Sequence, residues 1–200
     1  MNRFRHPLLA ALAVALAACA SAPVHYYTLI PPASAVAPTG PSAPFRFVLL
    51  PVGIPAQVDQ PQLVVREGGQ GVAVLDSRRW IAPLGDEVRG ALSADLARDL
   101  HTQDVSGLPA GRLPVLRIEV ELRRFDSAPD RYALIEAAWS IHALDSGTVL
   151  ACTSRIEENV GPGFDALVAG HQQALAALAR RIAGVAPAVA AGTVPACPAD

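Results

Sequence analysis

The spacing of apolar residues changes along the chain, and each period predicts a different kind of element. After Pro83, apolar side chains recur every four residues with charged residues between them, which predicts an amphipathic helix. These positions are Leu84, Val88, Leu92, Leu96 and Leu100. A second helix is expected from Phe164 to about Gly184, because one apolar stripe runs along it. That stripe consists of Phe164, Leu167, Val168, His171, Leu175, Leu178 and Ile182.

Other apolar residues form short runs or alternate with polar residues, as in strands. The expected strands are residues 26–29, 45–52, 62–66, 72–76, 116–123, 133–143 and 149–157. Glycines at 68, 69 and 71 favour a hairpin turn, since they match no phosphate-binding motif. Two helices against roughly five to seven strands predict an α/β fold: a single three-layer domain with a mixed β-sheet, β-hairpins and two main amphipathic helices.

Two turns are expected among the last three strands, a polar one at residues 126–130 and a tight one at 145–148. If Asp145 opposes Thr148, Cys152 pairs with Ile141 and lies on the apolar face of the hairpin. Cys152 is therefore expected to be a buried structural residue.

The first 18 residues have the pattern of an export signal. Arg3 and Arg5 precede eleven uncharged residues, 8–18, too few to cross a bilayer as a helix. Leu16 to Cys19, with the sequence LAAC, has the form of a bacterial lipobox, so residues 1–18 are expected to be removed and Cys19 to carry lipid. About three acyl chains would give durable attachment. The alternative is an ordinary signal peptide with an unrelated cysteine.

Proline content divides the rest of the chain. Residues 19–44 predict a lipidated N-terminus and a Pro-rich tether, interrupted by the strand at 26–29. Residues 45–184 contain the α/β domain, and residues 185–200 form a Pro/Ala-rich tail. If the short strand docks on the domain, about six free residues remain after Cys19 and reach about 20 Å.

Composition and charge exclude several functions. Loss of Arg3 and Arg5 would move the formal net charge from −2 to −4, and such a chain is a poor nucleic-acid binder. The histidines are too far from one another and from the cysteines to predict a metal site, and no cofactor motif is present. No G-x-S-x-G motif occurs, and His171 on an apolar stripe is typical of a core histidine. We therefore expect no enzyme activity.

The three cysteines are an odd number for an exported protein. If Cys19 is lipidated, Cys152 and Cys197 remain and could form a disulfide across about 45 residues. The alternative is that Cys197 lies unpaired in a disordered tail.

Three stretches, together with the lipobox, resemble one family of envelope lipoproteins. They are residues 25–29 (HYYTL), residues 58–66 (VDQPQLVVR), and Trp80 followed by Pro83 and Leu84 at the start of a helix. They are similar to PqiC-type lipoproteins, the auxiliary lipoproteins of ABC-type transport systems, from Cys19 to about Ile182. The resemblance implies a three-layer α/β fold with a mixed sheet.

The resemblance also implies a function. Such proteins are non-catalytic subunits on the periplasmic face of the outer membrane, and Ala20 after Cys19 favours sorting there. They work with an inner-membrane permease and ATPase and with a periplasm-spanning protein of MCE (mammalian cell entry) domains, in lipid transport that supports membrane integrity. A homo-oligomeric docking ring or a cap would suit this role.

The D-x-P-Q segment supplies the candidate partner contacts. These are Asp59, Gln60, Pro61, Gln62 and Arg66. The alternative is a loop locked for structural reasons. A second hypothesis for the whole protein is a periplasmic lipoprotein that itself binds a lipid or other apolar ligand between the sheet and a helix.

Overall fold

The computed structural model describes residues 23–32, 41–109 and 111–199, so Cys19 and the expected signal segment lie outside the described residues. The elements in this part are β1 (His25–Tyr27), β2 (Arg46–Leu49), β3 (Gln62–Gly68), β4 (Gly71–Trp80), α2 (Leu84–Leu100), β5 (Val115–Ala128), β6 (Tyr132–Ala143), β7 (Val149–Asn159) and α3 (Phe164–Ala190). The α/β fold class with two main helices and β-hairpins is confirmed.

The strands divide into two mixed sheets rather than one. In the four-stranded sheet, of order β2-β5-β6-β7, β2 runs parallel to β5 and the other pairs are antiparallel. In the three-stranded sheet, of order β1-β4-β3, β1 runs parallel to β4 and β3 antiparallel to it. Alternation predicts which side chains face the core, but not which strands pair, so this division lay beyond the sequence pattern.

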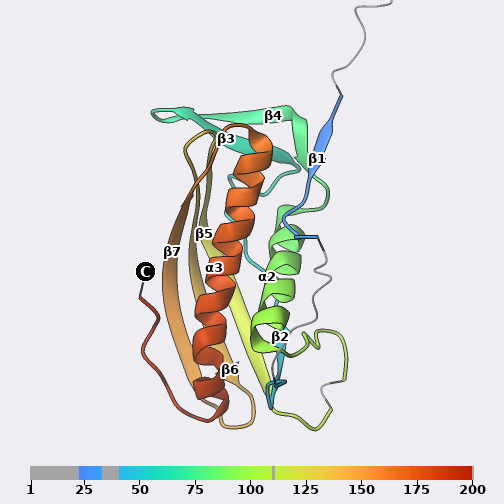
Figure 1. Ribbon diagram of the computed structural model, residues 1–200, viewed down its shortest axis with the longest axis vertical. Helices are drawn as coiled ribbons and strands as arrows, with labels where there is room; N and C mark the ends of the chain where they lie inside the picture. Colours follow the sequence, from blue (N-terminus) through green and yellow to red (C-terminus); the bar gives the residue numbers. More distant parts are fainter. Residues whose placement is uncertain (1–22, 33–40, 110, 200) are drawn as a thin grey trace, which may run out of the picture.

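Helices α2 and α3 lie side by side over one face of the four-stranded sheet, and the β3–β4 hairpin crosses one end of the molecule (Figure 1). The five apolar positions of the predicted four-residue repeat in α2 are all buried. They pack with β5 residues such as Ile118 and α3 residues such as Leu175 in one cluster. On the other face of this sheet, Arg117, Glu119 and Glu121 are exposed.

The β6–β7 hairpin has a longer turn than expected. The Ala143 N–H donates to the Thr148 carbonyl at 2.9 Å, and Gly147 takes the left-handed conformation with φ 74°. Cys152 consequently pairs with Trp139, two residues from its expected partner. Because the shift is two residues, every side chain keeps its predicted face. Cys152 is buried, 8% exposed.

Two boundaries also differ from the sequence pattern. β5 continues to Ala128, through part of the segment expected to turn, and Asp130 takes the left-handed conformation in the actual turn. α3 continues beyond Gly184 to Ala190, despite Pro187 inside it. Buried contacts of its last turns, including Val189, outweigh the missing backbone hydrogen bond.

Gly170 lets α3 pack closely on the sheet. In Gly170→Ala the new Cβ would overlap Val160 Cγ1 and lie 3.1 Å from Ala133 Cβ. We expect a loss of about 1–3 kcal/mol in the free energy of unfolding, measured by chemical denaturation, although alanine favours helix.

The matched control is Gly184→Ala in the same helix, where the new Cβ would meet nothing within 4 Å. This variant should gain about 0.5–1 kcal/mol from helix propensity. Equal gains at both positions would contradict the close packing at Gly170.

Candidate functional site

The segment that follows the expected lipid anchor is docked on the domain. β1 pairs with β4. Immediately after it, the Thr28 hydroxyl and the Leu29 N–H both donate to the carboxylate of Glu87, each at 2.7 Å. The Leu29 side chain is fully buried, and the Gln172 side chain donates to the Thr28 carbonyl at 3.2 Å. Both helices thus bind this segment, and β1 and the residues that follow it have a fixed place on the domain.

Glu87 is an anchoring residue that the four-residue apolar spacing of the helix did not single out. It is 2% exposed, and its carboxyl group accepts both hydrogen bonds from the N-terminal segment. A signal was present, because Glu87 follows Leu84 by three positions and so lies on the apolar stripe of the helix.

The D-x-P-Q segment presents few free side chains. Asp59 and Pro61 are exposed, whereas Gln60 and Gln62 are half-buried. The Trp80 N–H donates to the Pro61 carbonyl at 2.8 Å, and this bond connects the segment to β4. Buried apolar residues alternate with these polar ones; they are Val58, Leu63 and Val65. The segment is therefore fixed to the domain, and only its two exposed residues are freely available to a partner.

Arg66, the fifth candidate contact, binds within the molecule. Its Nε donates to Asp126 at 2.7 Å, and Arg124 donates to the other carboxylate oxygen at 2.7 Å. Burial raises the pKa of Asp126, but the hydrogen bonds from Arg66 and Arg124 outweigh it and leave the pKa below its ordinary value. Asp126 thus stays ionised and joins β3 to β5.

A cleft of about 330 Å³ opens beside this ion pair, between β3, residues 55–58 and β5. Val58, Val64 and Val72 line one part of it, and Arg123 and Arg124 line another. Its volume is at the lower end of the range for small-molecule sites. The cleft could take a small group with an apolar and an anionic part.

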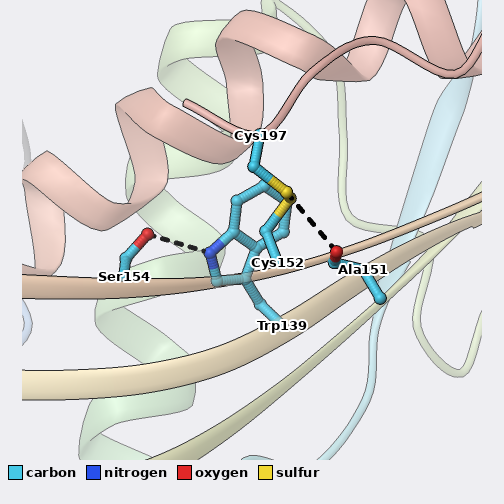
Figure 2. Close-up of a disulfide and its surroundings, with 5 residues drawn as sticks. All are labelled: Trp139, Ala151, Cys152, Ser154 and Cys197. Carbon is cyan, nitrogen blue, oxygen red and sulfur yellow. Dashed lines mark hydrogen bonds between the residues drawn. A yellow bond between two sulfur atoms is a disulfide. The ribbon is translucent and has the colours of Figure 1, made fainter. Parts of the chain in front are cut away.

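The two remaining cysteines are joined by a disulfide (Figure 2). The Cα atoms of Cys152 and Cys197 are 5.7 Å apart, and the bond attaches the segment after α3 to β7. The indole N–H of Trp139, the strand neighbour of Cys152, donates to Ser154 Oγ at 3.1 Å. A shallow groove of about 510 Å³ borders the disulfide and is lined partly by Glu119 and Glu121.

His171 lies in the core, as its place on the helix stripe indicated. It is 1% exposed, stacks on Phe125 with ring centroids 3.9 Å apart, and its Nε2 is 2.7 Å from Ser127 Oγ. Burial lowers its pKa to about 3, so the ring is neutral at ordinary pH. This histidine is a packing residue without access to a substrate.

Across the described ranges, no group of three or more His, Cys, Asp and Glu residues is placed to bind a metal ion. Among the described helices, none has the length and apolarity to cross a membrane.

The fold defines a class, a small α/β domain on which an N-terminal segment is docked. Residues 27–183 match the family described as ABC-type transport auxiliary lipoprotein component. Because this match covers most of the chain, the chain belongs to that family. Membership implies a lipid-anchored, membrane-associated protein that serves an ABC-type transport system.

Two solved structures share the fold. One is the crystal structure of an uncharacterized protein, with a TM-score of 0.64 and 20% identity over 82% of this chain and 98% of the other. The second is protein XCC0632 from Xanthomonas campestris, with a TM-score of 0.63 and 16% identity over 84% and 97% of the two chains. No curated protein matches the sequence.

Proposed function

We propose that this protein is a non-catalytic outer-membrane lipoprotein, anchored through Cys19, that docks the periplasm-spanning MCE protein of an ABC-type lipid transport system and so supports membrane integrity. Family membership is the observation that carries the proposal. The docking part is either a cap of one copy or a homo-oligomeric ring, and the mass of the isolated complex distinguishes the two.

The end of the domain opposite β1 offers a surface for such a partner. Five large apolar side chains are exposed on segments that lie at the lower end in Figure 1. They are Leu108, Leu113, Leu144, Val149 and Val194. Exposed apolar side chains that gather on neighbouring segments are typical of protein interaction sites.

The loop that carries Leu108 is fixed at its base by Asp104. Its carboxylate accepts hydrogen bonds from Ser93 at 2.8 Å, from the Ser106 N–H at 2.9 Å and from Arg89 at 3.2 Å. Burial raises the pKa of Asp104, but the hydrogen bonds from Ser106 and Ser93 outweigh it, so the pKa lies below its ordinary value. A fixed loop supports docking because little conformational freedom is lost on binding.

The alternative, a lipid held by this protein between the sheet and a helix, is less well supported. Side chains of α2, α3 and the four-stranded sheet form one continuous buried cluster at that place. Native mass spectrometry of the lipidated protein tests the alternative directly, since bound lipid beyond the covalent chains would favour it.

The docking proposal is tested by crosslinking the full lipidated protein in membranes and isolating it. We expect the MCE protein to be recovered with it, and Val149→Asp to reduce this recovery about tenfold, because the variant places a charge in an apolar contact. Ile81→Asp, at an apolar side chain that is 60% exposed and belongs to neither proposed surface, is the matched control and should retain the partner. Recovery of the lipoprotein alone, in amounts that match its membrane content, would overturn the proposal.

A further inference from the structure

The three-stranded sheet has one face packed on the domain and a second face that is only partly covered. On the second face Val64 packs against the core and Arg66 binds Asp126, whereas the β4 side chains are exposed. On the packed face, Leu63, Val65 and Trp80 are buried. Neighbouring positions point to the other face, where Val64 pairs with Val74 and Arg66 with Val72. Val72 and Val74 are 56% and 48% exposed. We call the set of exposed residues Tyr26, Val72 and Val74 the outer face.

Aromatic and basic side chains border these valines. Tyr26 is 58% exposed and pairs with Arg79 across β1 and β4. Tyrosine and arginine combine an apolar body with a polar end, which suits them to the boundary between lipid and water. Acidic residues, Glu67 and Asp76, are also exposed nearby. The outer face is thus apolar, and both basic and acidic side chains border it. Binding at this face therefore depends more on apolar contact than on net charge.

The tether places this face close to the membrane. β1 begins at His25, six residues after Cys19, and six residues span about 20 Å at most. α3 has 27 residues and is therefore about 40 Å long. Its first turn packs under the three-stranded sheet, where Arg78 lies 4.0 Å over the Phe164 ring, and its last turn lies at the far end (Figure 1). A lipid at Cys19 can therefore reach the bilayer only when the three-stranded sheet is near it.

We infer that the outer face lies against the surface of the lipid bilayer and orients the domain, with the long axis of α3 directed away from the membrane. The outer face contacts the membrane–water interface, where its valines and Tyr26 lie at the depth of the headgroups and upper acyl chains. The inference rests on the proposed lipidation of Cys19 and does not depend on the identity of the transport partner. It explains why a non-catalytic domain exposes valines on the sheet that receives its tether.

The test uses the full lipidated chain in vesicles whose lipids carry bromine on the acyl chains, which quenches nearby tryptophan. Val74→Trp places a reporter on the outer face, and Leu108→Trp, at a site 65% exposed, places one at the far end. Both native tryptophans are buried, 5% exposed at Trp80 and 3% at Trp139, and their emission is subtracted with the parent protein. Both reporter sites are exposed, and circular dichroism verifies that the variants fold.

We expect brominated vesicles to remove about half of the Val74→Trp emission and none of the Leu108→Trp emission. Adding Val72→Asp to Val74→Trp should abolish the quenching, whereas adding Val149→Asp should leave it unchanged. Equal emission in plain and brominated vesicles would overturn the inference. Absence of quenching in Val74→Trp together with a protein mass twice that of one chain would also overturn the inference. That result would assign the outer face to a second copy of the chain. Partner recovery is measured separately, so failure here would leave the docking proposal intact.

Discussion

Replacing Cys197 by serine is expected to lower the free energy of unfolding by about 4 kcal/mol. The disulfide with Cys152 closes a loop of 45 residues that contains most of β7 and all of α3. Without it, the unfolded chain gains the conformational freedom of that loop, and the segment after α3 loses its covalent attachment to β7. Denaturant unfolding of the oxidised wild type and of Cys197→Ser measures the difference.

Cys197 is the better position to change, because Cys197 is exposed while Cys152 is buried. A serine hydroxyl at residue 152 would add the cost of a buried polar group to the loss of the bond. Reductant is the matched control: it should bring the wild type to the stability of Cys197→Ser and leave the variant unchanged. A wild type that is indifferent to reductant, with intact mass showing both thiols free after treatment, would contradict the expected contribution.

The sequence pattern predicted the elements well because it depends on one local rule. Four-residue spacing in α2 and two-residue alternation in β5 and β6 each reflect one buried face, and burial dominates the choice of residue there. The ends of α3 and β5 were harder to predict from the sequence. Pro187 locally favours the end of a helix and Asp126 locally favours a turn, but tertiary contacts override both preferences. Packing of the last turns of α3 outweighs the effect of Pro187, and Arg66 and Arg124 compensate the charge of Asp126 within β5.

Contacts between distant segments were mostly hidden from the sequence. Hydrogen bonds from residues 28 and 29 to Glu87 link positions about 58 apart in the chain, and no local pattern encodes such a pair. The same holds for Arg66 and Asp126, which turn one of the five candidate partner contacts into an internal ion pair. The disulfide is an exception among these distant contacts. Only cysteines can form it, so a small number of cysteines leaves few possible pairings.

The two surfaces proposed for the membrane and the partner lie at opposite ends of the packed layer of α2 and α3. Glu87 at the start of α2 binds the tether segment, and Asp104 beyond its end binds the loop that carries Leu108. Both carboxylates are largely removed from solvent and accept several hydrogen bonds. The N-terminal segment and the loop that carries Leu108 are therefore each held against the domain. The point where the described chain enters the domain and the proposed docking surface are therefore held at opposite ends of the fold.

Acidification is expected to destabilise the protein through His171. Its pKa is about 3 in the folded protein, because burial disfavours the charged ring, and about 6.5 in the unfolded chain. Between these values the unfolded chain binds a proton that the folded protein does not, so stability falls as the pH decreases from about 6.5 towards 3. The loss between pH 7 and pH 5 should be about 2 kcal/mol, and urea unfolding at a series of pH values measures it.

His171→Gln separates this effect from other titrations. The variant has no ionisable group at the site, and its amide can still hydrogen-bond Ser127, so its stability should fall by about 2 kcal/mol less than that of the wild type over the same interval. Asp126 is the charged group next to His171, and its lowered pKa keeps it ionised at pH 5 in both proteins. If His171→Gln and the wild type lose stability in parallel, His171 is protonated in the folded protein and its core is open to water, in conflict with its 1% exposure.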